Sequence, residues 1–276
     1  MIHKIGWLLQ SAHFGTALIS ALMVALPLCW GELDECFIWV SILAMTTSTM
    51  IGFLLNDLSD VDRDQINKTF RPLASGRITK KMVVYFSCGL GIILLGSLTY
   101  LLSCSQCTLF LLAYFITYVL YNQINKVTGL LKNITISIGF VFPYLFVTSQ
   151  LQIVQQNIML LCSTLFFFLY RELLMDINDK DGDEKTGLMT IPVRFDDFVA
   201  RLLVAVYWMI AVLFLIAHTV VFSLDFRTVN LCFLIVVILT VQNFVWNNFS
   251  LSMRNMRILL MSMWGPMFLS VLTIKM

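Results

Sequence analysis

Apolar residues occur in long uninterrupted blocks in this 276-residue chain, and the charged residues are gathered between the blocks. Hydrophobic residues make up 59% of the chain and charged residues only 12%, about half of the charged share usual for a soluble domain. Several blocks reach about 20 residues, the length of helix that crosses a hydrocarbon core roughly 30 Å thick. Because backbone polar groups find no water there, such blocks fold as helices. The sequence therefore predicts an all-α, polytopic membrane protein.

Nine transmembrane helices are predicted from these blocks. Their ranges are 7–30, 37–58, 82–103, 106–122, 130–150, 157–177, 201–222, 230–248 and 257–275. The first block is too long for the apolar region of a signal peptide and ends in CWGELDE, so we interpret it as a retained helix. We expect the whole chain, 1–276, to form a single transmembrane domain.

Lysine and arginine positions predict the orientation of these helices. With the N-terminus in the cytoplasm, 15 of these residues fall in cytoplasmic segments, and only Arg227 and Lys275 fall on the opposite side. Positive residues accumulate in cytoplasmic loops. We therefore expect a cytoplasmic N-terminus, a C-terminus on the opposite side, and a site that opens to the cytoplasmic face. The net charge of +2, without a basic patch, does not indicate nucleic-acid binding.

Two acidic segments, NDLSDVDRD and MDINDKDGD, each follow a predicted span. Their aspartates advance by the same steps of three, two and two residues, and the second set lies 119 residues after the first. The two sets are Asp57, Asp60, Asp62 and Asp64, and Asp176, Asp179, Asp181 and Asp183. Their matching positions after the second and sixth spans predict two parallel four-helix repeats, approximately 1–125 and 126–250, followed by a ninth helix.

Helical geometry indicates which of these side chains point together. At 100° per residue, an arc of about 80° holds Asn56, Asp60 and Asp64. An arc of about 60° holds Asp176, Asp179 and Asp183 by the same rule. One acidic cluster after a span is typical of a solvated loop, but two at matching spacing favour a site. Facing carboxylate stripes repel unless cations lie between them, and carboxylate oxygens completed by substrate phosphate oxygens are typical of Mg²⁺. These six residues are the predicted ligands of magnesium.

Basic residues follow or precede each acidic segment. Lys68 and Arg71 come after the first one, Lys185 and Arg194 come after the second, and Lys126 precedes the fifth predicted span. Alternating acidic and basic groups around one cytoplasmic opening suit a metal-bound polyphosphate. For most single lysines and arginines here, the general excess of positive charge in cytoplasmic loops is a sufficient explanation.

Four stretches carry recognisable motifs. NDLSDVDRD contains the pattern NxxxDxxxD, RPLASGRI follows it, YNQINKVTGLLKN precedes the fifth predicted span, and RELLMDINDKDGDEKTGLMTIPV contains the second acidic pattern. In these stretches the chain resembles the UbiA superfamily of intramembrane prenyltransferases over its whole length. The last two stretches look most like the branch that includes geranylgeranylglycerol-phosphate geranylgeranyltransferases.

The resemblance implies a ring of helices around a central cavity and a reaction that depends on two magnesium ions held by these six residues. A prenyl group would pass from an isoprenyl diphosphate to a lipophilic acceptor, or to an aromatic or hydroxyl one. The implied catalytic residues are Asp60, Asp64, Asp179 and Asp183. The implied diphosphate-binding residues are Arg71, Lys126 and Tyr121. The implied acceptor region includes Gln10, His13 and Asn133.

One departure from the family pattern leaves the reaction type open. Many members carry Arg-Pro-x-Asn early in the first span, where this chain has Gln10-Ser11-Ala12-His13. An intramolecular terpene cyclase, which needs no acceptor, is therefore an alternative on the same scaffold. A transporter is disfavoured because the charges cluster at one face and few ionisable residues fall within the spans. A non-catalytic scaffold protein would not require two matched aspartate sets.

Overall fold

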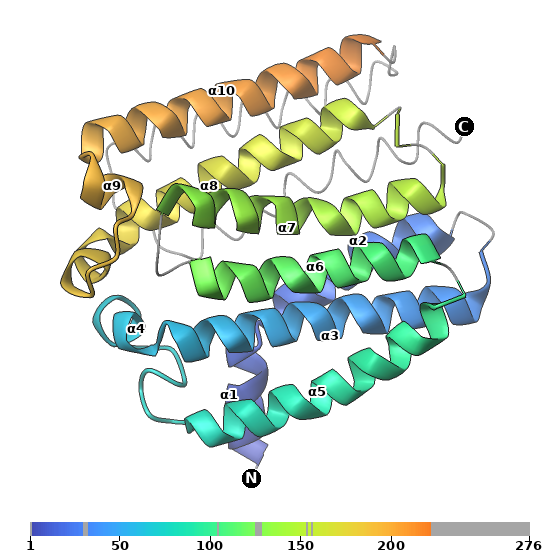
Figure 1. The fold of residues 1–276 in the computed structure, drawn as a ribbon, viewed down its shortest axis with the longest axis horizontal. Coiled ribbons are helices and arrows are strands. Elements are labelled where there is room, and N and C mark those ends of the chain that lie inside the picture. The colour runs from blue at the N-terminus through green and yellow to red at the C-terminus, as the bar shows by residue number, and fades with distance from the viewer. Residues whose placement is uncertain are drawn as a thin grey trace.

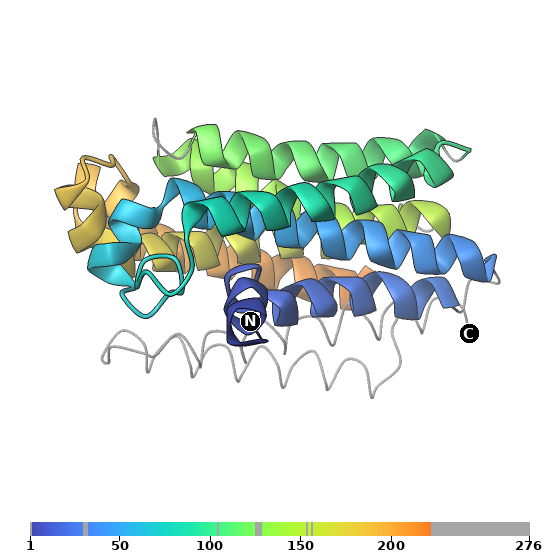
Figure 2. The ribbon, with the colours of Figure 1, turned by 90° about the horizontal axis from the view of Figure 1, so that it is seen from below.

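The computed structural model describes residues 2–29, 33–103, 105–124, 129–152, 154–155 and 157–221. This part of the chain is helical and contains no strand, which confirms the all-α prediction for it. The helices are α1 (Ile2–Ser11), α2 (Phe14–Cys29), α3 (Glu35–Ser59), α4 (Val61–Asn67), α5 (Lys80–Leu101), α6 (Ser105–Ile124), α7 (Gly129–Gln150), α8 (Ile158–Lys185), α9 (Ile191–Arg194) and α10 (Asp197–Val221). In Figures 1 and 2 the long helices lie side by side, and the short α4 and α9 lie at the same end of the bundle.

Five of the described helices, α3, α5, α7, α8 and α10, are long and apolar enough to cross a membrane. They correspond to the spans predicted at 37–58, 82–103, 130–150, 157–177 and 201–222. The span predicted at 106–122 coincides with α6, whose apolar stretch is shorter, Thr108–Tyr121. The spans predicted at 230–248 and 257–275 lie outside the described residues. The membrane character is thus supported, and the count of nine helices stays a prediction.

The first predicted span, 7–30, is interrupted in the structure. α1 ends at Ser11 and α2 begins at Phe14, and the two helices meet at an angle of 60°. His13 between them has a φ of 48°, a left-handed conformation that an α-helix does not accommodate. Together α1 and α2 count as a sixth candidate span. Ser11, the last residue of α1 before the bend, reaches the first acidic cluster. Its hydroxyl donates a hydrogen bond to Asp57 of α3.

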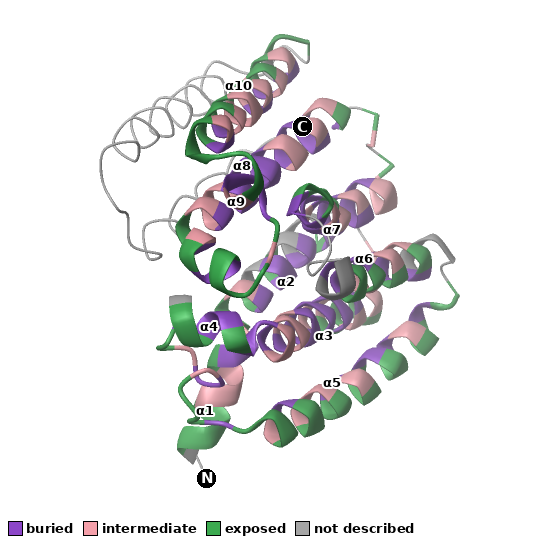
Figure 3. Cartoon of the chain, turned by 60° about the vertical axis from the view of Figure 1, so that its left-hand side comes forward, coloured by how far each residue is buried: buried purple, intermediate pink, exposed green. Residues whose placement is uncertain are grey.

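Burial separates inner from outer helices. In their most apolar stretches, α3 buries 61% of its residues and α7 and α8 bury 56% each, but α5 and α10 bury only 22%. Figure 3 shows exposed residues along the outward sides of α5 and α10. Outer helices with apolar exposed faces, such as Leu95 on α5 and Leu213 on α10, are what a lipid surrounding requires.

The two halves of the described chain pack in the same order. α3 packs against α2 and α5, and α8 packs against α7 and α10. A shift of 119 residues places α2, α3 and α5 onto α7, α8 and α10. The segment that would match α6 lies outside the described residues, so the four-helix repeats over 1–125 and 126–250 remain a prediction.

The helix carrying the first acidic cluster breaks within it. α3 ends at Ser59, Asp60 has φ −100° and ψ 5°, and α4 starts at Val61. The expectation that Asn56, Asp60 and Asp64 share one continuous helix is therefore wrong, because the Asp60 backbone ends one helix and starts the next. The second cluster lies on α8, which continues unbroken to Lys185.

Candidate active site

Burial sorts the eight aspartates of the two clusters in the same way. In each set the first, second and fourth members are buried and the third is exposed. The exposed ones are Asp62 and Asp181. The buried ones are Asp57, Asp60, Asp64, Asp176, Asp179 and Asp183. Six carboxylates thus lie inside the protein at one end of the bundle, where each must meet a cation or a hydrogen-bond donor.

Arg71 holds the first cluster together. Its Nη1 donates to Asp57 at 2.9 Å and to Asp64 at 2.6 Å. Arg71 lies in the turn that follows α4, so the return of the chain over the end of α3 brings its guanidinium to both carboxylates. Asp57 also accepts a hydrogen bond from Ser11 of α1.

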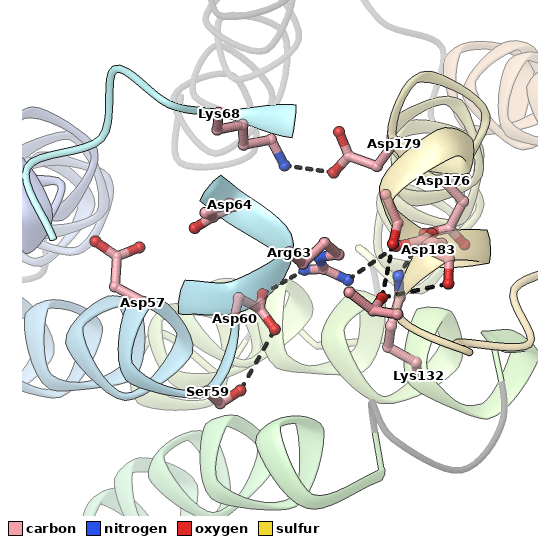
Figure 4. A network of polar contacts seen from close by, with 12 residues as sticks. Asp57, Ser59, Asp60, Arg63, Asp64, Lys68, Lys132, Asp176, Asp179 and Asp183 are labelled. Carbon is pink, nitrogen blue, oxygen red and sulfur yellow. Dashed lines mark hydrogen bonds and ion pairs between the residues drawn. The ribbon is translucent and has the colours of Figure 1, made fainter. Parts of the chain in front are cut away.

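Two basic residues of the first half reach the second cluster. Arg63 forms an ion pair with Asp60 and a second one with Asp183 of α8, where Nη1 lies 3.3 Å from the carboxylate oxygen. Lys68 forms an ion pair with Asp179. Figure 4 shows Arg63 between the helix that bears Asp60 and the helix that bears the second cluster. The two acidic segments, 119 residues apart in sequence, therefore form one network.

Asp176 is held by α7. Lys132 forms an ion pair with it, and the side-chain amide of Asn133 donates to its other oxygen at 2.8 Å. Asp176 corresponds to Asp57 in the repeated spacing, and both are held by one cation and one neutral donor. The matching residues of the two clusters are thus supported by the same kinds of partners.

The charges within this network do not balance. Six buried carboxylates meet four basic side chains, Arg63, Lys68, Arg71 and Lys132, so two formal negative charges remain among the described residues. Burial raises the pKa of Asp64 above its ordinary value, although Arg71 and Lys68 act in the opposite direction. Burial lowers the pKa of Arg63, but the carboxylates around it outweigh this effect and raise the pKa overall, so Arg63 stays charged.

A cavity of about 580 Å³ adjoins the network. Its polar end is lined by Asn56, Arg63, Lys68, Arg71, Lys132, Asp176 and Asp179. The rest of its lining is mainly apolar and aromatic, but also holds the charged pair Arg171 and Glu172. The apolar and aromatic residues include Leu9, Phe14, Phe53, Tyr118, Ile136, Phe140, Phe168 and Met175. A charged end joined to an apolar chamber suits an amphipathic ligand with an anionic head and a hydrocarbon tail.

Close helix packing shapes the aromatic wall at Gly52. A Cβ atom at this position of α3 would lie 2.4 Å from the ring of Tyr118 on α6. The glycine therefore lets the tyrosine ring lie directly against the α3 backbone. Phe140 and Phe168 stack on each other with ring centroids 4.2 Å apart, and Arg171 lies over Phe140 while paired with Glu172.

The structure brings most of the predicted site residues together, but only some of them line the cavity. The cavity is lined by Gln10, His13, Asn56, Arg71, Tyr121, Asp176 and Asp179. The carboxylates of Asp60, Asp64 and Asp183 do not line it, and each is bound by a guanidinium that does, Arg63 or Arg71. Asn133, expected in the acceptor region, instead supports Asp176. Lys126 lies outside the described residues.

The donor set fits magnesium in its chemistry. Buried oxygens without a hydrogen-bond partner among the described residues include Asn56 Oδ1, Asp64 Oδ1 and Asp183 Oδ2. Oxygen atoms of carboxylates and amides are the ligands that Mg²⁺ prefers. Within the described ranges no three acidic, histidine or cysteine side chains converge on one point, because basic side chains separate the carboxylates. Binding an ion here would therefore require Arg63 or Lys68 to give up part of its contact.

Three contributors were not predicted from the sequence: Asp57, Arg63 and Lys132. Asp57 is the first aspartate of the repeated spacing and matches Asp176, so the spacing alone would have indicated it. The NxxxDxxxD motif selects its neighbour Asn56 instead. Arg63 lies inside the acidic segment and Lys132 at the start of a span, where both are also explained by charge bias in cytoplasmic loops. Their pairing with distant carboxylates requires the folded structure.

Comparison with known proteins places this geometry in context. The model of the UbiA prenyltransferase family matches residues 14–272. Two relatives named digeranylgeranylglyceryl phosphate synthase, from Methanococcus aeolicus and Korarchaeum cryptofilum, are 27% and 31% identical to the chain over 52% of its length. These matches span about half of each relative, 50% and 51%.

A solved structure shares the fold. The structure of a UbiA homolog from Archaeoglobus fulgidus bound to GPP and Mg²⁺ superimposes with a TM-score of 0.72, covering 96% of this chain and 99% of that chain at 16% identity. At this identity the match supports the helical architecture alone.

Proposed function

The chain belongs to the UbiA prenyltransferase family, and from this premise we propose that it transfers a prenyl group from an isoprenyl diphosphate to a lipophilic acceptor within the membrane. The observation that carries the proposal is one network of six buried aspartates, from two segments far apart in sequence, beside a partly apolar cavity that Asp176 and Asp179 line directly. A purely structural role would not require so many buried charges in one place, because burying charge is unfavourable.

The donor would lie with its diphosphate at the charged end and its hydrocarbon chain along the aromatic wall. Arg71 and Lys132 line the cavity there and would donate to phosphate oxygens, and Tyr121 also lines the cavity. Each methylene group buried along Phe53, Phe140 and Phe168 contributes about 0.8 kcal/mol to binding. Lys126 is retained as a further diphosphate-binding candidate from the sequence.

Magnesium, held by Asn56 and the carboxylates of Asp60, Asp64, Asp176, Asp179 and Asp183, would neutralise the charge that grows on the leaving diphosphate. The two excess negative charges of the network match one divalent ion. The diphosphate brings negative charge of its own, which a second ion would balance, and we therefore propose two ions. This count is supported by charge balance and by the six oxygen-bearing side chains.

In the reaction the allylic carbon–oxygen bond breaks and its electron pair leaves with the diphosphate. The acceptor then forms a bond to the same carbon and loses a proton. Aromatic faces such as Phe53 and Tyr118 favour positive charge on the allylic group as it develops. The enclosed apolar wall keeps water away from this reactive group.

The acceptor is inferred from the relatives' name and from the residues beside the bend of α1 and α2. The relatives' name describes a glyceryl phosphate product, so a hydroxyl group on a glyceryl phosphate lipid is the first acceptor to test. Gln10 and His13 line the cavity beside the bend of α1 and α2 and would contact it. His13 stacks on Phe53 with ring centroids 4.4 Å apart, which holds the imidazole at the wall.

The test is turnover by purified protein in detergent or vesicles. We expect a prenylated acceptor and free diphosphate when an isoprenyl diphosphate, a glyceryl phosphate lipid and Mg²⁺ are present, and no product after chelation. A cyclic hydrocarbon or alcohol formed without an acceptor would instead identify the terpene cyclase. Release of neither product from any donor chain length would contradict the proposal.

A further inference from the structure

Arg63 differs from the other cations of the site in how it is bound. Its guanidinium pairs with Asp60 beside it in the chain and with Asp183 of α8, so it joins the two halves of the protein. The residue is 7% exposed and lines the cavity. Its Nε atom is buried and has no hydrogen-bond partner among the described residues. One donor of this bridging side chain is thus unused.

The neighbouring cations do not have this combination. Arg71 binds two carboxylates, but both belong to the first cluster. Lys132 binds Asp176 of the second cluster only, and Lys68 contributes one ammonium to Asp179. A planar guanidinium can hold two carboxylates at once and still present a further N–H, which an ammonium group cannot do in the same fixed geometry.

Asp60 and Asp183 are also proposed ligands of magnesium, so Arg63 occupies a place where a divalent cation would bind. We propose that Arg63 is a resident cation of the diphosphate site: without substrate it joins Asp60 and Asp183 in place of a divalent ion, and with substrate it donates to the diphosphate. This inference rests on the proposed function, because it assigns the partner of that same site.

The arrangement has two effects of opposite sign. A fixed positive charge competes with Mg²⁺ for the two carboxylates, so Arg63 weakens the binding of the metal alone. The same charge forms a charge-assisted hydrogen bond to a phosphate oxygen, so Arg63 strengthens the binding of diphosphate. If Arg63 only maintained the fold, replacing it would weaken the binding of both Mg²⁺ and diphosphate, or would change neither.

The test uses the full-length protein in detergent and two calorimetric titrations, Mg²⁺ alone and inorganic pyrophosphate at saturating Mg²⁺. For Arg63→Met we expect the dissociation constant of Mg²⁺ to fall by roughly threefold or more and that of pyrophosphate to rise by roughly tenfold. Arg63→Lys keeps the charge but cannot bridge both carboxylates, so we expect smaller changes of the same two signs. Arg77→Met, which removes an exposed arginine, is the control and should change neither constant.

The outcomes separate this inference from the proposed function. Wild-type protein that binds no pyrophosphate with Mg²⁺ would contradict the proposed function. Wild-type binding combined with weaker affinity for both ligands, or with unchanged affinities, in the arginine variants would overturn the role of Arg63 alone. If Arg63→Met does not fold, the signs of the two changes in Arg63→Lys decide the question.

Discussion

The two acidic clusters are alike in which side chains they bury and unlike in how the backbone presents them. In both, the first, second and fourth aspartates are buried and the third, Asp62 or Asp181, is exposed. The first cluster spans a helix break at Asp60, whereas the second lies on the unbroken α8. The same spacing therefore produces the same burial on two different backbones, because neighbouring elements select which side chains turn inward.

The clusters also differ in the source of their counter-charges. Arg63 lies within the first cluster and Lys68 and Arg71 follow it. Two of these bases, Arg63 and Lys68, pair with the second cluster. The base within the second cluster, Lys180, instead pairs with the partly exposed Asp197 at 2.7 Å, away from the network. The first half thus supplies cations to both clusters, and α8 supplies a straight row of carboxylates.

The largest expected effect comes from neutralising one central carboxylate in either cluster. Asp60→Asn and Asp179→Asn should each reduce turnover by about 100-fold to 1,000-fold, because each removes charge that the leaving diphosphate and its metal require. The measurement is steady-state release of diphosphate by the purified variants.

The exposed aspartates provide matched controls for this prediction. Asp62→Asn and Asp181→Asn remove the same charge from the same segments at positions that face solvent. Their turnover should stay within about twofold of the wild type, as is usual for surface substitutions. A loss as large as that of Asp60→Asn would mean that burial does not separate functional from non-functional members of the clusters.

A loss of stability, rather than of turnover, should distinguish inner from outer ion pairs of the second cluster. Lys132→Met leaves Asp176 buried without its cation and should lower the free energy of unfolding by about 3–5 kcal/mol. Lys180→Met removes an exposed pair and should cost about 1 kcal/mol or less. Thermal unfolding in detergent without added metal measures both, and equal losses would contradict the description of the network.

Losses of stability smaller than that of Lys132→Met are expected for the neutral donors that support corresponding carboxylates. Ser11→Ala removes a hydrogen bond to Asp57, and Asn133→Ala removes one to Asp176. Each should lower stability by about 1.5–3 kcal/mol, the usual worth of a hydrogen bond to a charged group. Comparing the two variants in one assay tests whether Asp57 and Asp176 are equivalent. A clear loss in only one of them would show that the repeated spacing does not extend to the supporting residues.

The sequence predicted the helical class and the membrane character, because long apolar blocks have few alternative explanations. The repeated aspartate spacing pointed to carboxylates that the structure brings into one buried network, and their role as a site stays a prediction. The sequence did not predict the bend at His13 or the break at Asp60. Both depend on one backbone conformation within an otherwise helical pattern. Local preferences of histidine and aspartate permit such a conformation but do not require it.

The sequence also did not predict which carboxylate each basic side chain binds. Arg63 and Lys132 each bind a carboxylate more than 40 positions away, and no local pattern specifies such a contact. Asn133 shows the reverse case, because the family motif indicated a role near the acceptor and the structure places its amide against Asp176. Residue types at the site were therefore predictable, and their partners were not.

The central claim is that the two clusters bind one metal–diphosphate complex, and a double-mutant cycle tests it directly. The measurement is the affinity for inorganic pyrophosphate at saturating Mg²⁺ in the wild type, Asp60→Asn, Asp179→Asn and the double variant. If both carboxylates hold one complex, each single variant should lose about 10-fold to 100-fold in affinity, and the double variant should lose little more than either. Losses that multiply in the double variant, or a loss confined to one cluster, would contradict a shared site.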